Sequence, residues 1–167
     1  MGFPGSTYTL DPLTLESLTD GSAVRTYFIE LSTFQQQPLL GNYDQGKLCL
    51  SDCGLIVAEE WVRSATHRRG VDLDRWMVTP TSLKSILFLH EPTEAGTPML
   101  DVAASQKPWL LSSLITSFKA VTAKRINLCR NQPGQSVWQR SYNQILIADP
   151  VRLSDLRHQL DRGADEG

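Results

Sequence analysis

The residues of this chain that could do chemistry begin with Ser82 and Lys84. They stand two positions apart in an apolar stretch typical of a strand, so both side chains should point to the same face. A serine becomes a nucleophile when an adjacent base activates it. The sequence shows neither the glycine pattern of a nucleophile elbow nor an acid–base partner for Ser82. We therefore expect no serine chemistry at this position.

The histidines do not form a metal-binding pattern. Two imidazoles at spacing i, i+2 on a strand or i, i+4 on a helix can hold a divalent metal, and His67, His90 and His158 have no such partner. A surface or capping role is the expectation for each histidine.

The cysteines are expected to be ordinary thiols. Cys49, Cys53 and Cys129 have apolar neighbours, and the spacing of the first two is not that of a zinc knuckle. No second Cys/His pair follows them.

Composition fits one soluble domain. The chain is 41% hydrophobic, which is enough for one substantial core. With 167 residues it is too short for two stable domains. No apolar run approaches the length of a membrane span, and the N-terminus lacks the regions of a signal peptide. We expect a cytoplasmic protein with an irregular arm at 1–23, a domain at 24–162 and a disordered tail at 163–167.

Hydrophobic periodicity predicts strands that alternate with helices. Strands are expected at 25–33, 71–78, 84–90 and 141–148, a hairpin at 42–50, and helices at about 52–70, 108–131 and 149–163. The polar stretch 91–106 contains Pro92, Gly96 and Pro98, which predicts a mobile loop. Strands interleaved with helices over a single antiparallel sheet give an α+β, ferredoxin-like architecture.

Two helices show an apolar stripe. Ser51 is the expected N-cap of the first helix. We expect the first helix to bury Leu55, Ala58, Val62 and Ala65, and the second to bury Leu111, Leu114, Ile115, Phe118, Val121 and Leu128.

Five segments follow one another in the order found in a known family. They are YFIELSTFQQQPLLG (27–41), KLCLSDCGLIVAEEWVR (47–63), DRWMVTPTSLKSILFL (74–89), SFKAVTAKRIN (117–127) and VWQRSYNQILIADP (137–150). Together they resemble the REP-associated tyrosine transposases, members of the single-tyrosine HUH superfamily that cut and rejoin single-stranded DNA. The resemblance spans residues 24–160 and implies an HUH transposase-like fold.

The third segment departs from the family at two positions. The family reads about Trp-x-Val-Met-Pro-Asn-His-x-His, and Trp76, Val78 and Pro80 keep that frame. Ser82 and Lys84 stand where the resemblance places two metal-binding histidines. Serine is a poor ligand and an ammonium is repelled by a cation, so we expect no metal and no other cofactor.

The family's nucleophile is a tyrosine on the last helix, in a Tyr-Ile-x-x-Asn-Pro motif. The matching pair here is Gln159-Leu160. A carboxamide does not attack phosphorus, so covalent catalysis would be lost. The resemblance therefore implies a degenerate active site with no catalytic residues, in a protein that is no longer an enzyme.

Positive charge is concentrated in one part of the chain. The segment 102–148 has no acidic residue and six basic ones, Lys107, Lys119, Lys124, Arg125, Arg130 and Arg140. Cations beside aromatic residues suit single-stranded DNA, although a solvated helix face beside core aromatics explains them equally. The predicted DNA-binding residues are Lys84, Lys119, Lys124, Arg125, Arg130, Trp138, Arg140 and Tyr142.

The sequence thus predicts a non-catalytic, transposase-derived protein that binds single-stranded or hairpin DNA. The alternative is a protein-interaction or dimerisation module without DNA binding, and a second alternative is a transposase active in DNA transposition. The resemblance also implies a symmetric homodimer. No membrane partner is expected.

Overall fold

A four-stranded antiparallel sheet forms the centre of the computed structural model, which describes residues 22–92 and 108–165. The strands are β1 (Ser22–Ser32), β4 (Val71–Val78), β5 (Ser82–Pro92) and β6 (Asn143–Ile147), in the spatial order β4-β5-β1-β6. β1 pairs antiparallel with both β5 and β6. The predicted α+β class is confirmed.

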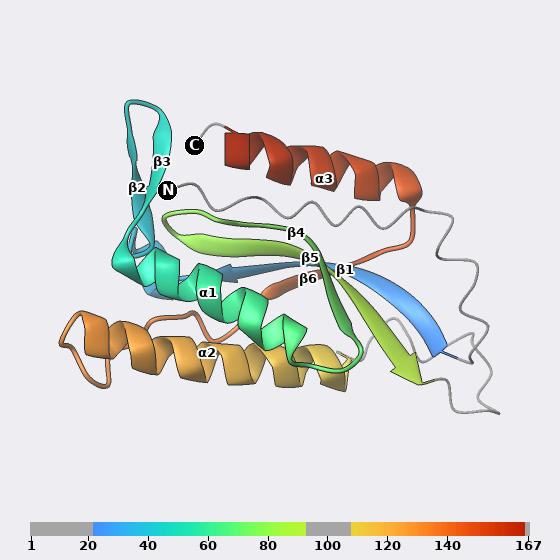
Figure 1. Cartoon of the computed structure of the whole chain (residues 1–167), viewed down its shortest axis with the longest axis horizontal. Helices are drawn as coiled ribbons and strands as arrows, with labels where there is room; N and C mark the ends of the chain where they lie inside the picture. Colours follow the sequence, from blue (N-terminus) through green and yellow to red (C-terminus); the bar gives the residue numbers. More distant parts are fainter. Residues whose placement is uncertain (1–21, 93–107, 166–167) are drawn as a thin grey trace.

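Three helices and a hairpin surround this sheet. Helices α1 (Asp52–Thr66) and α2 (Trp109–Cys129) cover one face, and α3 (Pro150–Asp165) lies over the other (Figure 1). The chain order β1-α1-β4-β5-α2-β6, with this strand order, is the ferredoxin-like arrangement. The hairpin of β2 (Gly41–Asp44) and β3 (Lys47–Leu50) stands away from one end of the sheet (Figure 1).

Local signals mark the start of α1 and the turn of the β2–β3 hairpin. The Ser51 hydroxyl accepts a hydrogen bond from the Gly54 amide at 3.2 Å and donates to the Leu39 carbonyl at 2.8 Å, so it is the N-cap of α1. At the hairpin turn Gln45 and Gly46 both have positive φ, 52° and 82°. The predicted cap and turn are therefore confirmed.

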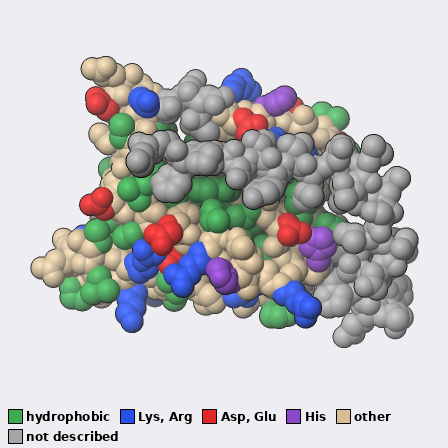
Figure 2. Space-filling model, in the orientation of Figure 1, with side chains coloured by type: hydrophobic (Ala, Val, Ile, Leu, Met, Phe, Trp, Pro, Cys, Tyr) green, Lys and Arg blue, Asp and Glu red, His purple; other side chains and the backbone are tan. Residues whose placement is uncertain are grey.

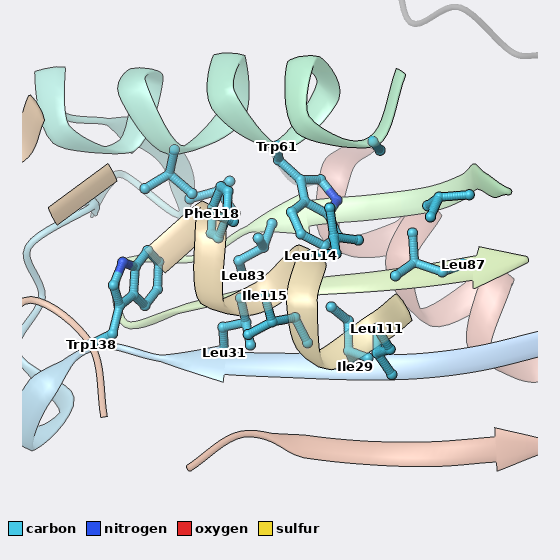
Figure 3. Packing of buried hydrophobic residues seen from close by; sticks show 14 of the residues in the cluster. Ile29, Leu31, Trp61, Leu83, Leu87, Leu111, Leu114, Ile115, Phe118 and Trp138 are labelled. Carbon is cyan, nitrogen blue, oxygen red and sulfur yellow. The ribbon is translucent and has the colours of Figure 1, made fainter. Parts of the chain in front are cut away.

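The core lies between the sheet and the two helices on its face. Ile29 and Leu31 of β1 and Leu83 and Leu87 of β5 point toward α1 and α2 (Figure 3). The rings of Trp61 and Phe118 meet edge to face, with centroids 5.0 Å apart. Each of these larger apolar side chains contributes about 1.5–3 kcal/mol through burial, before conformational entropy is charged against it.

The buried stripe of α1 differs from the predicted one. The helix buries Cys53, Val57, Trp61 and Ala65, which recur every four residues, whereas Leu55 and Val62 are exposed. Trp61 is the largest apolar side chain of α1, and its indole Nε1 donates to the Ser85 hydroxyl at 3.1 Å. Burying this side chain outweighs burying Leu55 and Val62.

The stripe of α2 is correct in its first half. Leu111, Leu114, Ile115 and Phe118 are buried as predicted. In the second half Val121 and Leu128 are exposed, and Ile126 is buried instead.

Several predicted boundaries are wrong. Helix α1 ends at Thr66 rather than near residue 70, and β5 begins at Ser82 rather than at residue 84. β5 continues through Pro92, so 91–92 belong to a strand, and 93–107 of the predicted loop lie outside the described residues. Helix α3 continues to Asp165, so 163–165 are helical where a disordered tail was expected. Residues 166–167 and most of the predicted arm, 1–21, also lie outside the described part. Among the helices described, none is long and apolar enough to cross a bilayer.

Candidate nucleic-acid interface

The two faces of β5 carry different side chains. Successive residues of a strand point to opposite faces, and Leu83, Ser85 and Leu87 face the core beneath α1 and α2. Ser82 and Lys84 therefore share the other face of the sheet, on the side of α3. The predicted common face of these two residues follows from this alternation.

Ser82 closes a turn. Its backbone N–H donates to Thr79 Oγ1 at 3.0 Å, the two hydroxyl oxygens lie 2.8 Å apart, and the Thr79 N–H donates to the Ser82 carbonyl at 2.8 Å. The residue is 4% exposed. Its hydroxyl is engaged in this turn between β4 and β5, which is a structural role.

Lys84 is paired with a carboxylate on the neighbouring strand. Its Nζ lies 3.6 Å from Glu30 Oε1, and the two residues are register partners in β5 and β1. The Lys84 and Glu30 side chains are 36% and 28% exposed. A pair this exposed holds its partners weakly, by about 0–1 kcal/mol, so Lys84 remains open to exchange Glu30 for another anion.

Helix α3 is fixed over β4 by two ion pairs. Arg157 Nε donates to Asp74 Oδ2 at 2.6 Å, and Arg75 Nε lies 2.9 Å from Asp161 Oδ1. The register between β4 and β5 shifts between Leu73 and Trp76, which is where Asp74 and Arg75 stand. This irregularity in β4 places both residues within reach of α3.

Gln159, the residue at the family's nucleophile position, is exposed on α3. Its neighbour Leu160 is buried, and Gly163 lies so close to Met77 that a Cβ there would contact the Met77 thioether. Met77 is the register partner of Lys84. Gly163 of α3 therefore packs against the β4 residue that is opposite Lys84, and glycine has no side chain that could react.

The groups at Ser82 and Lys84 do not fit the divalent metal of the resembled family. The Ser82 hydroxyl is bonded within its turn and the Lys84 ammonium repels a cation. Glu30 brings a carboxylate to this face, and Lys84 pairs with it. No metal-dependent step is assigned to this site.

Lys119, a predicted DNA contact, is a tether inside the fold. Its Nζ donates to the backbone carbonyl of Gln139 at 2.7 Å and lies 3.3 Å from that of Ser141. It also stands 5.7 Å from the centre of the Tyr142 ring. These contacts fix the segment that leads into β6, and Tyr142 packs against the core.

Arg125 and Arg130 also have internal partners. Arg125 donates to Glu60 at 2.5 Å and to Glu59 at 3.2 Å, and these hydrogen bonds raise the pKa of its guanidinium. Arg130 Nε donates to Asn127 Oδ1 at 2.9 Å at the end of α2. The positive charge of Arg125 is therefore compensated within the protein.

Trp138, another predicted DNA contact, is buried in the core. The residue is 8% exposed, its Nε1 donates to Thr122 Oγ1 at 2.9 Å, and its ring centroid lies 5.8 Å from that of Phe118. Figure 3 shows it at the end of the core, beside Phe118. These contacts with Thr122 and Phe118 give Trp138 a packing role in the core.

Lys124 and Arg140 keep the properties that DNA binding needs. Both are exposed, and neither has an ion pair among the residues described. Lys107 of the same basic segment lies outside the described residues. Of the basic residues predicted in the segment 102–148, only Lys124 and Arg140 are therefore both exposed and without an ion pair among the residues described.

A second group of basic side chains stands at the end of α1, outside the segment 102–148. Arg63, His67, Arg68 and Arg69 lie within or directly after its last turn. Figure 2 shows Lys and Arg side chains, with a His among them, where α1 and α2 meet the solvent. The run His67-Arg68-Arg69 was the available signal, and averaging charge over the acidic first hundred residues concealed it.

Comparison with known proteins finds solved structures of similar shape, two of which are described here. A REP-associated tyrosine transposase bound to a REP hairpin is 16% identical, with a TM-score of 0.47 over 82% of this chain. This chain spans 62% of the length of that transposase. A candidate transposase from Deinococcus radiodurans is 14% identical, with a TM-score of 0.45 over 84% of this chain and 92% of its own. No family model and no curated protein matches the chain.

Proposed function

We propose that this protein is a transposase-derived DNA-binding protein that holds single-stranded or hairpin DNA and does not cut it. The observation that carries the proposal is the Lys84–Glu30 pair on the sheet face beneath α3. The resemblance places two metal-binding histidines on this face, at Ser82 and Lys84. Here the face offers an ammonium, which attracts a phosphate and cannot coordinate a metal.

The proposed loss of cutting rests on two positions in different elements. Breaking a phosphodiester through a covalent intermediate needs a nucleophile, and the exposed side chain of Gln159 ends in a carboxamide. The same reaction also needs ligands for the metal that polarises the phosphodiester, and Ser82 and Lys84 do not provide them. Both requirements fail independently, so restoring one of them would not restore cleavage.

The proposed retention of DNA rests on exposed cations. Lys84, Lys124 and Arg140 are the predicted contacts that keep an accessible charge. If each neutralises one phosphate of a single strand, log affinity falls against log salt with a slope of about −2.

The experiment is a salt titration of binding by fluorescence anisotropy. A labelled single-stranded hairpin oligonucleotide is titrated with protein at several salt concentrations. The proposal expects saturable binding whose affinity falls as salt rises, and lower affinity in the Lys124→Ala/Arg140→Ala double variant. Absence of binding at low salt, with the protein folded by circular dichroism, would overturn it.

A second candidate is a protein-interaction module, possible because internal partners take up several predicted DNA contacts. Its specific support is the exposed apolar pair Val121 and Leu128, which lie on one side of α2. A homodimer built on such a surface would be self-complementary. Light scattering tests it: a dimer at micromolar concentration that dissociates in Leu128→Lys favours the module, and a monomer argues against it.

A further inference from the structure

A pocket with a cationic rim lies between the end of α1 and the first half of α2, on the opposite face of the sheet from Lys84. It has a volume of about 350 Å³ and is lined by Ser64, His67, Arg68, Arg69, Leu114 and Ser117. Three basic side chains and two hydroxyls surround the buried Leu114, and no carboxylate lines the pocket. Its chemistry is therefore that of an anion site.

Arg68 is held in place without losing its charge. Its guanidinium donates to Ser113 Oγ at 2.7 Å and to Ser117 Oγ at 3.4 Å, both neutral acceptors. Arg125, farther along the same pair of helices, instead meets the carboxylates of Glu60 and Glu59. Serine hydroxyls orient Arg68 across 45 residues of sequence, and its positive charge stays available to an anion from outside.

Arg69 adds a donor to the same rim, and His67 lies beside it. Arg69 is exposed and has no ion pair among residues 22–92 and 108–165. His67 Nδ1 lies 2.8 Å from the Arg63 carbonyl, which can only accept, so Nδ1 donates this hydrogen bond. The imidazole is thus held by the end of α1, at the edge of the pocket.

The C-terminus of a helix ordinarily disfavours an anion, because its last carbonyls carry partial negative charge. Here the His67 N–H donates to the Arg63 carbonyl and the Arg68 N–H to the Ala65 carbonyl, both at 3.1 Å. Two full guanidinium charges outweigh the half charge of the helix end.

We propose that this pocket binds a phosphate of a single-stranded nucleic-acid backbone. The planar guanidinium of Arg68 matches two phosphate oxygens, Arg69 adds a mobile cation, and Ser64 and Ser117 offer hydroxyl donors. A backbone phosphate suits this open rim between two helices, because the rest of the strand can continue over exposed residues such as Lys124. The inference rests on the proposed function. It adds a DNA contact on the α1–α2 side of the sheet, opposite the face that carries Lys84.

The first test uses the dinucleotide dTpdT, which carries one phosphodiester, and follows the arginine Nε–Hε signals by NMR. The Arg68 and Arg69 signals are expected to shift with dTpdT, while those of Arg152 and Arg162, exposed on α3, stay in place. No shift at millimolar dTpdT overturns the proposal. Shifts with inorganic phosphate alone, and none with dTpdT, overturn it in favour of a site for free phosphate.

The second test compares the salt slope of single-strand binding in two charge-matched variants. With Arg68 and Arg69 added to Lys84, Lys124 and Arg140, the wild-type slope is expected near about −3.5, and Arg68→Ala/Arg69→Ala lowers it to about −2. Arg152→Ala/Arg162→Ala should leave the slope closer to wild type. Equal slopes in the two variants overturn the proposal, and Arg69→Ala alone, at an exposed position, guards against misfolding.

The proposed function and the phosphate pocket can be refuted separately. If wild type binds no single strand while dTpdT still shifts Arg68, the proposed function fails and the phosphate pocket stands. If the strand binds and neither Arg68 nor Arg69 responds, the pocket fails and the proposed function stands.

Discussion

Glu30 and Lys84 face each other across β1 and β5, with Glu30 Oε1 3.6 Å from Lys84 Nζ. The carboxylate neutralises the ammonium at the place where a phosphate would have to bind. Any DNA contact made by Lys84 therefore competes with Glu30, and the two residues should affect DNA affinity in opposite directions.

Removing the carboxylate should strengthen DNA binding. Glu30→Gln is expected to tighten binding of a single-stranded hairpin by about twofold to fivefold, and Lys84→Ala to weaken it by a similar factor, as expected for one partly exposed charge. Anisotropy titrations at fixed salt measure both. In the double variant the gain from Glu30→Gln should vanish. A gain that persists without Lys84 would show that Glu30 acts on another cation.

The pair of Arg125 with Glu60 should matter for stability. Glu60 is 5% exposed, and Arg125 supplies its shortest hydrogen bond. Arg125→Met leaves a buried carboxylate with the more distant Arg63, 3.8 Å away, and should lower the free energy of unfolding by about 1–3 kcal/mol. Urea unfolding measures this change. Glu59→Gln, at the exposed end of the same cluster, should change it by less than about 0.5 kcal/mol.

Two glycines should tolerate alanine differently. A Cβ at Gly54 would overlap the backbone carbonyl of Leu40. Leu40 is fixed by two backbone hydrogen bonds, since its N–H donates to the Pro80 carbonyl and its carbonyl accepts from the Ser51 N–H. A Cβ at Gly163 would meet only the flexible end of Met77. Gly54→Ala should therefore cost at least about 2 kcal/mol, while Gly163→Ala should stay within about 1 kcal/mol of wild type. Thermal unfolding of the two variants that gave equal losses would contradict this packing.

The three cysteines should react at two rates. Cys49 and Cys129 are exposed, whereas Cys53 is buried, and burial, with the neighbouring Cys129 thiol, raises its pKa. A raised pKa means less thiolate at a given pH, and thiolate is the reactive form. A thiol-specific reagent at pH 8 should modify two cysteines quickly and the third slowly, with mass spectrometry assigning Cys53 as the slow one. Fast modification of all three would place α1 differently.

Features set by near neighbours in the sequence were predictable. The Ser51 cap, the Gln45-Gly46 turn and the common face of Ser82 and Lys84 depend on a few consecutive residues. Trp138 was not predictable in this way, because its burial depends on Thr122 and Phe118 of another element. The pairing of Arg125 with Glu60 was not predictable for the same reason, because the two residues lie on different helices.

The proposed phosphate pocket could not be predicted from the sequence, for the same reason. Arg68 and Ser113 lie in different helices, and each alone is an ordinary surface residue. Only the packing of α1 on α2 brings them together. Charge counted along the chain pointed to the segment 102–148, whereas the folded surface adds Arg68 and Arg69 from a segment that is acidic on average.

One reaction examined in two gels tests the central claim most directly. A labelled single-stranded hairpin is incubated with the protein and magnesium or manganese, and halves of the sample are run on native and denaturing gels. The account predicts a shifted complex on the native gel and intact, unattached DNA on the denaturing gel. A shortened strand, or DNA that stays covalently joined to protein under denaturing conditions, would contradict it.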